Sequence, residues 1–124
     1  METESFQSSP SLEEIENDWK KVREFFRENF NKLPDINSVI FMIGVRELGK
    51  GKKHFSKEEK QDLMHIAICK ILSYSGYYEL EGLDADGWPH WKPLQKVPFL
   101  DVINQEKFLK MHIAEYFRKE GLIN

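Results

Sequence analysis

The chain has 124 residues, of which 40% are hydrophobic and 31% are charged, and its formal net charge is −3. This length suits one domain with a single hydrophobic core. The acidic balance argues against a general nucleic-acid-binding protein, because neutralising phosphate groups requires a concentrated basic surface. Cys69 is the single cysteine, so no intrachain disulfide can form, and the composition suits a reducing compartment.

The N-terminal segment gives no sign of a secretory signal. Residues 1–10 are acidic and polar, whereas a signal peptide has a basic start followed by an apolar stretch. The longest apolar run, residues 39–45, is far shorter than the roughly 20 residues that span a bilayer. We therefore predict a cytoplasmic protein with no membrane segment, in which a flexible tail of residues 1–10 precedes one helical domain of residues 11–124.

The first helix is predicted over residues 11–31. Ser11 and Glu14 have the spacing of a capping box, in which each side chain bonds the backbone of the other residue. Apolar residues then recur every three or four positions and form a narrow stripe: Leu12, Ile15, Trp19, Val22, Phe26, Phe30 and Leu33. A narrow stripe contacts one neighbouring surface, which is either the body of the same domain or a second copy of the chain.

The second helix is predicted over residues 36–48, with Asp35 or Asn37 as its N-cap. Its apolar residues point in every direction when wound as a helix, which is typical of an interior segment. The short apolar run of residues 38–45 fits a buried strand equally well. We favour the helix because the sequence contains no strong candidate for a partner strand.

The third helix, predicted over residues 57–75, is the expected centre of the fold. Ser56 and Glu59 form a second capping box. The apolar residues of this helix cover about half of its circumference, so it is expected to contact more than one neighbour.

Residues 77–98 are predicted to form a long aromatic loop, or a loop that contains a short β-hairpin, and a fourth helix follows over residues 105–119. The predicted fold class is therefore all-α, a small four-helix bundle-like domain whose aromatic loop covers one end.

Two motifs resemble ligand-binding loops but lack required residues. Gly44 to Lys50 satisfies the GxxxxGK pattern of a phosphate-binding loop, yet the next position is Gly51, where magnesium binding requires Ser or Thr. This segment is interpreted as a helix C-terminus followed by a basic loop. Asp84, Asp86 and Gly87 resemble part of a calcium loop, but the later ligands are missing, and Asp-Gly is strong β-turn chemistry.

One combination of residues could bind a metal ion. Asp62 and His65 lie three positions apart on the third helix and could hold one ion together with Asp84, Asp86 or His90 from the loop. Mixed nitrogen and oxygen ligands suit zinc, manganese or iron. The alternative is that these polar side chains form the solvated edge of the helix. We expect no cofactor, and a divalent metal ion is the alternative.

The aromatic loop also offers a candidate surface for a ligand or a partner. Trp88 and Trp91 flank a proline that restricts the backbone, with Tyr77, Tyr78 and His90 nearby in sequence. Tryptophan and tyrosine dominate the energetics of many protein interfaces and line many ligand pockets. The alternative is that these rings fill the open end of the bundle.

The leading functional hypothesis is a small non-catalytic module that binds an unknown protein partner or forms a homodimer. The alternative is a small metal- or ligand-binding enzyme whose site lies between the third helix and the loop from Asp84 to Trp91. We expect no nucleic-acid partner and no membrane partner.

Overall fold

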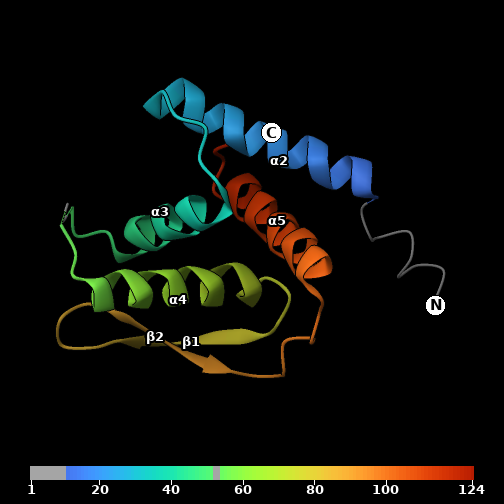
Figure 1. The fold of residues 1–124 in the computed structure, drawn as a ribbon. Coiled ribbons are helices and arrows are strands. Elements are labelled where there is room, and N and C mark those ends of the chain that lie inside the picture. Colours follow the sequence, from blue (N-terminus) through green and yellow to red (C-terminus); the bar gives the residue numbers. More distant parts are fainter. Residues whose placement is uncertain (1–10, 52–53) are drawn as a thin grey trace. The chain divides into compact units, whose positions relative to one another are not determined.

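The structure is a computed structural model that describes residues 11–51 and 54–124, so the predicted tail of residues 1–10 and two lysines of the basic loop lie outside it. The described chain is mostly helical and contains one two-stranded sheet (Figure 1). Its elements are α2 (Leu12–Phe30), α3 (Ile36–Leu48), α4 (Lys57–Ser73), β1 (Tyr78–Leu83), β2 (Pro89–Pro93) and α5 (Val102–Lys119).

The described residues divide into two compact units. The two-helix unit comprises residues 11–33 and 100–124 and contains α2 and α5, whereas the hairpin unit comprises residues 34–99 and contains α3, α4 and the two strands. A four-helix bundle is therefore not confirmed, because the helices divide in pairs between the units. The prediction of one helical domain over residues 11–124 stays a prediction.

In the two-helix unit, α2 contacts α5, and the middle of the narrow apolar stripe is buried whereas Leu12, Phe30 and Leu33 at its ends are about half exposed. The buried residues of the stripe are Ile15, Trp19, Val22 and Phe26. The Phe117 ring of α5 lies 5.5 Å from the ring of Phe25 and 5.7 Å from that of Phe26, measured between centroids. The stripe thus packs within its own unit, and the predicted capping box begins the helix, with Ser11 N–H donating to Glu14 at 2.8 Å.

A buried lysine lies on the same contact between α2 and α5. Lys110 is only 8% exposed, and its ammonium lies 3.0 Å from Glu16 and 3.1 Å from Glu106. Burial lowers the pKa of Lys110, the two carboxylates raise it, and the net shift is upward. Arg118 pairs with Asp18, so a second ion pair connects the same two helices.

In the hairpin unit, α3 is a helix, so the alternative of a buried strand is wrong. The Asp35 side chain accepts a hydrogen bond from the Ser38 N–H at 2.8 Å and caps the helix. A Cβ atom on Gly44 would lie 2.1 Å from the carbonyl oxygen of Leu63 in α4. The first glycine of the GxxxxGK pattern therefore allows two helices to approach closely, and the interpretation of the segment as a helix C-terminus is confirmed.

Helix α4 contacts α3 on one side and the hairpin on the other, which confirms that it has more than one neighbour (Figure 1). The predicted capping box at its start is present, with Ser56 N–H donating to Glu59 at 2.8 Å. The helix ends at Ser73, two residues before the predicted end, and a turn through Gly76 (φ 81°) leads into the hairpin.

Helix α5 begins three residues earlier than predicted. Asp101 is its N-cap and accepts a hydrogen bond from the Asn104 N–H at 2.8 Å. The predicted start was wrong because the cap at Asp101 was not recognised. The two apolar residues that follow it, Val102 and Ile103, form the first turn of the helix and are exposed. None of the described helices is both long enough and apolar enough to cross a membrane.

Candidate functional site

The predicted aromatic loop contains an antiparallel β-hairpin. Leu80 lies opposite Trp91 and Gly82 lies opposite His90. One residue, Glu81, separates the two positions on β1, whereas none separates them on β2, so β1 contains a β-bulge. Gly82 adopts a φ of 144°, a conformation that glycine allows at the bulge.

The turn between the strands is organised by one carboxylate. One oxygen of Asp84 accepts hydrogen bonds from the N–H of Asp86 at 2.9 Å and from that of Trp88 at 3.0 Å. The other oxygen lies 3.0 Å from Nε2 of His90. The predicted β-turn is confirmed by the hydrogen bond from the Gly87 N–H to the Asp84 carbonyl at 3.0 Å.

Asp84 and His90 form an exposed pair at the end of the hairpin. The contact with His90 is the largest cause that lowers the pKa of Asp84, and the Trp88 N–H adds to it. Asp84 is therefore ionised at neutral pH and can hold the His90 imidazole. The carboxylate is already occupied by three donors, so its evident role is to shape the turn.

The four aromatic residues of the predicted partner surface are half-buried: Tyr77, Tyr78, Trp88 and Trp91. Burial raises the pKa of the Tyr78 phenol, with a smaller effect from Cys69 of α4, and β1 contacts α4. The indole N–H of Trp91 is buried and has no hydrogen-bond partner among the described residues. These rings thus contribute to packing while keeping part of their surface exposed, and His90 is exposed beside them.

The predicted metal ligands of α4, Asp62 and His65, are exposed. Nε2 of His65 lies 3.5 Å from Sγ of Cys69, which is fully buried. Burial raises the pKa of the Cys69 thiol to about 11. The thiol is therefore protonated at neutral pH, and a buried protonated thiol is a poor nucleophile.

The structure brings only some of the predicted metal ligands together. Asp84 and His90 are in contact, and Asp86 lies in the same turn. In residues 11–51 and 54–124, no group of three or more His, Cys, Asp and Glu side chains is placed to hold a metal ion. The proposed ligation by Asp62 and His65 together with the loop stays a prediction.

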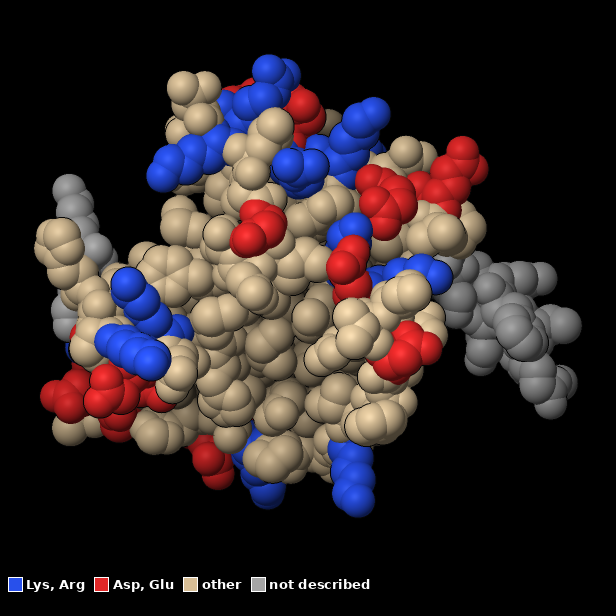
Figure 2. Space-filling model, viewed as in Figure 1, with Lys and Arg blue, Asp and Glu red and all other residues tan. Residues whose placement is uncertain are grey.

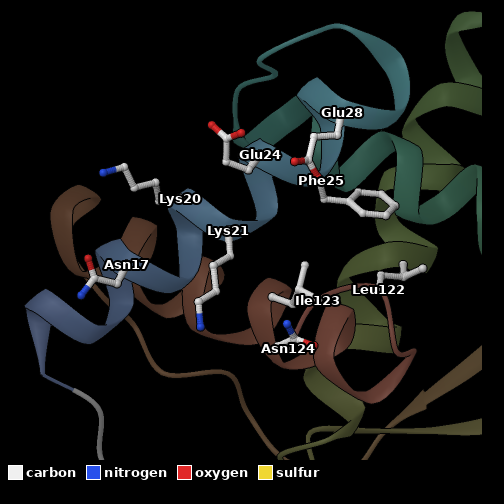
Figure 3. A pocket seen from close by; sticks show the side chains of 9 residues that line it. All are labelled: Asn17, Lys20, Lys21, Glu24, Phe25, Glu28, Leu122, Ile123 and Asn124. Carbon is white, nitrogen blue, oxygen red and sulfur yellow. The ribbon is translucent and has the colours of Figure 1, made fainter.

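A groove in the two-helix unit was not predicted. It has a volume of about 660 Å³ and is lined by nine residues: Asn17, Lys20, Lys21, Glu24, Phe25, Glu28, Leu122, Ile123 and Asn124. Lys21 extends from α2 toward the C-terminal residues, whereas Lys20 and Glu24 point away from them (Figure 3). Two lysines and two glutamates line the groove, so its lining favours neither anions nor cations. Basic and acidic side chains are both present in the region of α2 (Figure 2).

The hairpin unit also exposes large apolar side chains that sequence periodicity did not reveal. Five of them, each between 41% and 101% exposed, occur between residues 80 and 99 and are here called the exposed apolar residues: Leu80, Leu83, Leu94, Val97 and Phe99. Phe99 is the most exposed of the five. Large apolar residues are normally expected in a core, so the exposure of these five becomes visible only in the structure.

No protein-family model, curated protein or solved structure matches this chain.

Proposed function

We propose that the protein is a small non-catalytic cytoplasmic module that binds another protein, or a second copy of itself, through the hairpin unit. The observation that carries this proposal is the set of exposed apolar residues between Leu80 and Phe99. Large apolar side chains that gather at a protein surface mark binding sites more often than isolated ones do.

The energetic reason is the cost of hydrating these side chains. Burying a phenylalanine or leucine that was fully exposed contributes roughly 1.5–3 kcal/mol. Phe99 is 101% exposed and forgoes this contribution in the free chain. A partner that covers Phe99 and Val97 would recover it.

The half-buried tryptophans support the same surface. The Trp88 N–H bonds Asp84 in the turn, and Trp91 lies on β2 opposite Leu80, so the backbone that carries both rings is ordered before a partner binds. Rigid aromatic groups of this kind are typical of the centres of protein interfaces.

Site-specific photo-cross-linking tests the proposal. A photoreactive phenylalanine analogue placed at Val97 or Phe99 is expected to give discrete protein adducts in cell extract, or a cross-linked dimer of the purified chain. The matched control is the analogue at Leu12, which is 53% exposed but lies in the other unit, and it should give neither product. Sedimentation at several concentrations then distinguishes self-association from binding to another protein. A strict monomer with no discrete adduct from either position would contradict the proposal.

The metal-binding enzyme is the second candidate, because two of its predicted loop ligands, Asp84 and His90, lie 3.0 Å apart. Elemental analysis of protein purified without added metal tests this candidate, with His65→Ala and His90→Ala as control variants. Stoichiometric metal that is lost in either variant would support a metal site. Absence of metal, or metal content unchanged in both variants, would contradict it.

A further inference from the structure

The two outer edges of the hairpin differ in their capacity to bind another strand. The Leu94 N–H donates to the Tyr77 carbonyl at 2.9 Å, and the Asp84 N–H donates to the Trp88 carbonyl at 2.9 Å. In an antiparallel ladder, hydrogen-bonded and non-hydrogen-bonded pairs alternate. Applied to the observed register, this alternation makes three pairs non-hydrogen-bonded: Tyr78 with Pro93, Leu80 with Trp91, and Leu83 with Pro89.

The residues of these three pairs direct their backbone groups away from the partner strand. On β2 they are Pro89, Trp91 and Pro93, so two of the three outward positions carry no N–H. Proline at such positions is one way in which proteins prevent strands from adding to an exposed edge. The outer edge of β2 is therefore a poor template for another strand.

The outer edge of β1 has no such block. Its outward residues are Tyr78, Leu80 and Leu83, and each carries both an N–H and a carbonyl. Within the part of the chain that the structure describes, these backbone groups have no hydrogen-bond partner across the outer edge. Leu80 and Leu83 are also 50% and 67% exposed, so the edge is open.

The side chains of β1 indicate what kind of strand would fit. Strand alternation places Tyr78 and Leu80 on the face that includes Trp91, and Glu79 with Lys92 on the opposite face. Both strands contact α4, and Tyr78 and Trp91 are half-buried whereas Glu79 and Lys92 are exposed, so the first face is the one toward α4. Glu79 and Glu81 are exposed, and neither has an ion pair among the described residues. An added strand would thus meet leucines on one face and carboxylates on the other.

These charges argue against pairing of β1 with β1 of a second copy. An antiparallel pairing of two β1 strands would set the glutamates of one copy beside those of the other, and like charges across a sheet are destabilising. Basic side chains on an incoming strand would instead be attracted to them.

We propose that the outer edge of β1 binds an extended segment of a partner protein in which apolar and basic residues alternate. Main-chain hydrogen bonds to Tyr78, Leu80 and Leu83 would hold the segment, its apolar side chains would cover the two leucines, and its basic side chains would pair with Glu79 and Glu81. This inference rests on the proposed function, since it specifies the partner of the hairpin unit.

The test uses the full chain and a synthetic peptide, acetyl-KVKVKVK-amide, as the probe. Amide hydrogen exchange measured by NMR is expected to slow by about tenfold or more at Tyr78 and Leu80, because each amide becomes a ladder donor. A peptide of the same composition in blocks, acetyl-KKKKVVV-amide, and the acidic peptide acetyl-EVEVEVE-amide should leave both rates unchanged. Unchanged exchange at saturating KVKVKVK peptide, or equal protection by the block peptide, would overturn the proposal.

Two variants separate backbone pairing from charge. Leu80→Pro removes an outward donor without touching the bonds to β2, and it should abolish peptide protection at Tyr78. The double variant Glu79→Lys, Glu81→Lys should no longer bind the basic KVKVKVK peptide and should bind the acidic EVEVEVE peptide. Its matched control, Glu13→Lys with Glu28→Lys in α2, has the same net charge and should behave as the unchanged chain. If the charge reversal at β1 leaves binding of both peptides unchanged, the proposal is overturned, even if Leu80→Pro fails to fold.

The outcomes also separate this inference from the proposed function. Discrete adducts from Val97 or Phe99 without peptide protection at β1 would overturn strand addition alone. Protection of Tyr78 and Leu80 in a peptide-free dimer would show that a second copy occupies the edge, which overturns the assignment of a basic partner.

Discussion

The two units of the molecule hold their helices together by different means. In the two-helix unit, α2 and α5 meet through large aromatic rings and through Lys110, which lies between two glutamates. In the hairpin unit, α3 and α4 meet at Gly44, where a backbone carbonyl of α4 occupies the space of a side chain. One contact depends on side-chain volume and charge, and the other depends on the absence of a side chain.

The difference affects how each contact responds to substitution. A contact made by large side chains loses stability when atoms are removed, because a cavity remains and the surroundings collapse only partly. A contact made by a glycine loses stability when atoms are added, because backbone atoms cannot move aside cheaply. Removal of side-chain atoms should therefore destabilise the two-helix unit, whereas addition of atoms at Gly44 should destabilise the hairpin unit.

The largest expected effect is that of Phe117→Ala in α5. Phe117 is 2% exposed and packs against Phe25 and Phe26, so truncation should lower the free energy of unfolding by about 4 kcal/mol. Urea unfolding followed by circular dichroism measures the loss. Phe30→Ala is the matched control, because Phe30 contacts the same rings but is 50% exposed, and it should cost much less. Equal losses in the two variants would show that the ring cluster is not the support of this unit.

Gly44→Ala should come next, with a loss of about 3 kcal/mol. The sign of the effect is the decisive observation. Alanine normally stabilises a helix interior over glycine by about 0.5–1 kcal/mol, but here its Cβ would lie 2.1 Å from the Leu63 carbonyl oxygen. Asn37→Ala, at an exposed position of the same helix, should change stability by less than about 0.5 kcal/mol. A Gly44→Ala variant as stable as the unchanged chain would show that the contact between α3 and α4 does not require a glycine at this position.

Local signals in the sequence were sufficient to predict most of the helices. The capping boxes at Ser11 and Ser56 each involve four neighbouring residues, so their spacing alone located two helix starts correctly. The start of α5 was missed because Asp101 is followed by two apolar residues that resemble a buried segment yet are exposed. Burial is decided by the rest of the chain, which a local pattern does not contain.

Only part of the candidate site could be predicted in the same way. Asp-Gly chemistry correctly indicated the turn at Asp86 and Gly87, whereas the pairing of Asp84 with His90 depends on the strand register. The register also decides that Pro89 and Pro93 face outward on β2, and a one-residue shift would reverse this. The open edge of β1 therefore became visible only in the structure.

The buried lysine tests whether charge or volume matters more in the contact between α2 and α5. Lys110→Ala should cost about 2 kcal/mol, because it removes a long buried stem and leaves Glu16 and Glu106 without their cation. Lys110→Met keeps most of the volume and should stay within about 1 kcal/mol of the unchanged chain, since apolar residues often replace buried ions without loss. Thermal unfolding of the three proteins measures both effects. A methionine variant as unstable as the alanine variant would show that the ion pairs, rather than the volume, support this contact.

The smallest expected effect concerns the capping box, which is present once in each unit. Ser11 and Ser56 form the same capping box with the same two distances, 2.8 Å and 3.1 Å, but one begins α2 and the other begins α4. Each Ser→Ala substitution should cost about 1 kcal/mol, because it leaves one backbone N–H without its acceptor. Amide exchange should then show where the loss is felt, since residues that unfold together lose protection together.

If the units unfold independently, Ser11→Ala should raise exchange rates in α2 and α5 only, and Ser56→Ala should raise them in α3, α4 and the hairpin only. Glycine at either position is the control, because it costs only a few tenths of a kcal/mol at an N-cap and should leave exchange nearly unchanged. An equal rise over all described helices in both alanine variants would mean that the two units unfold as one. The contrast between an aromatic and a glycine contact would then describe two parts of a single cooperative core.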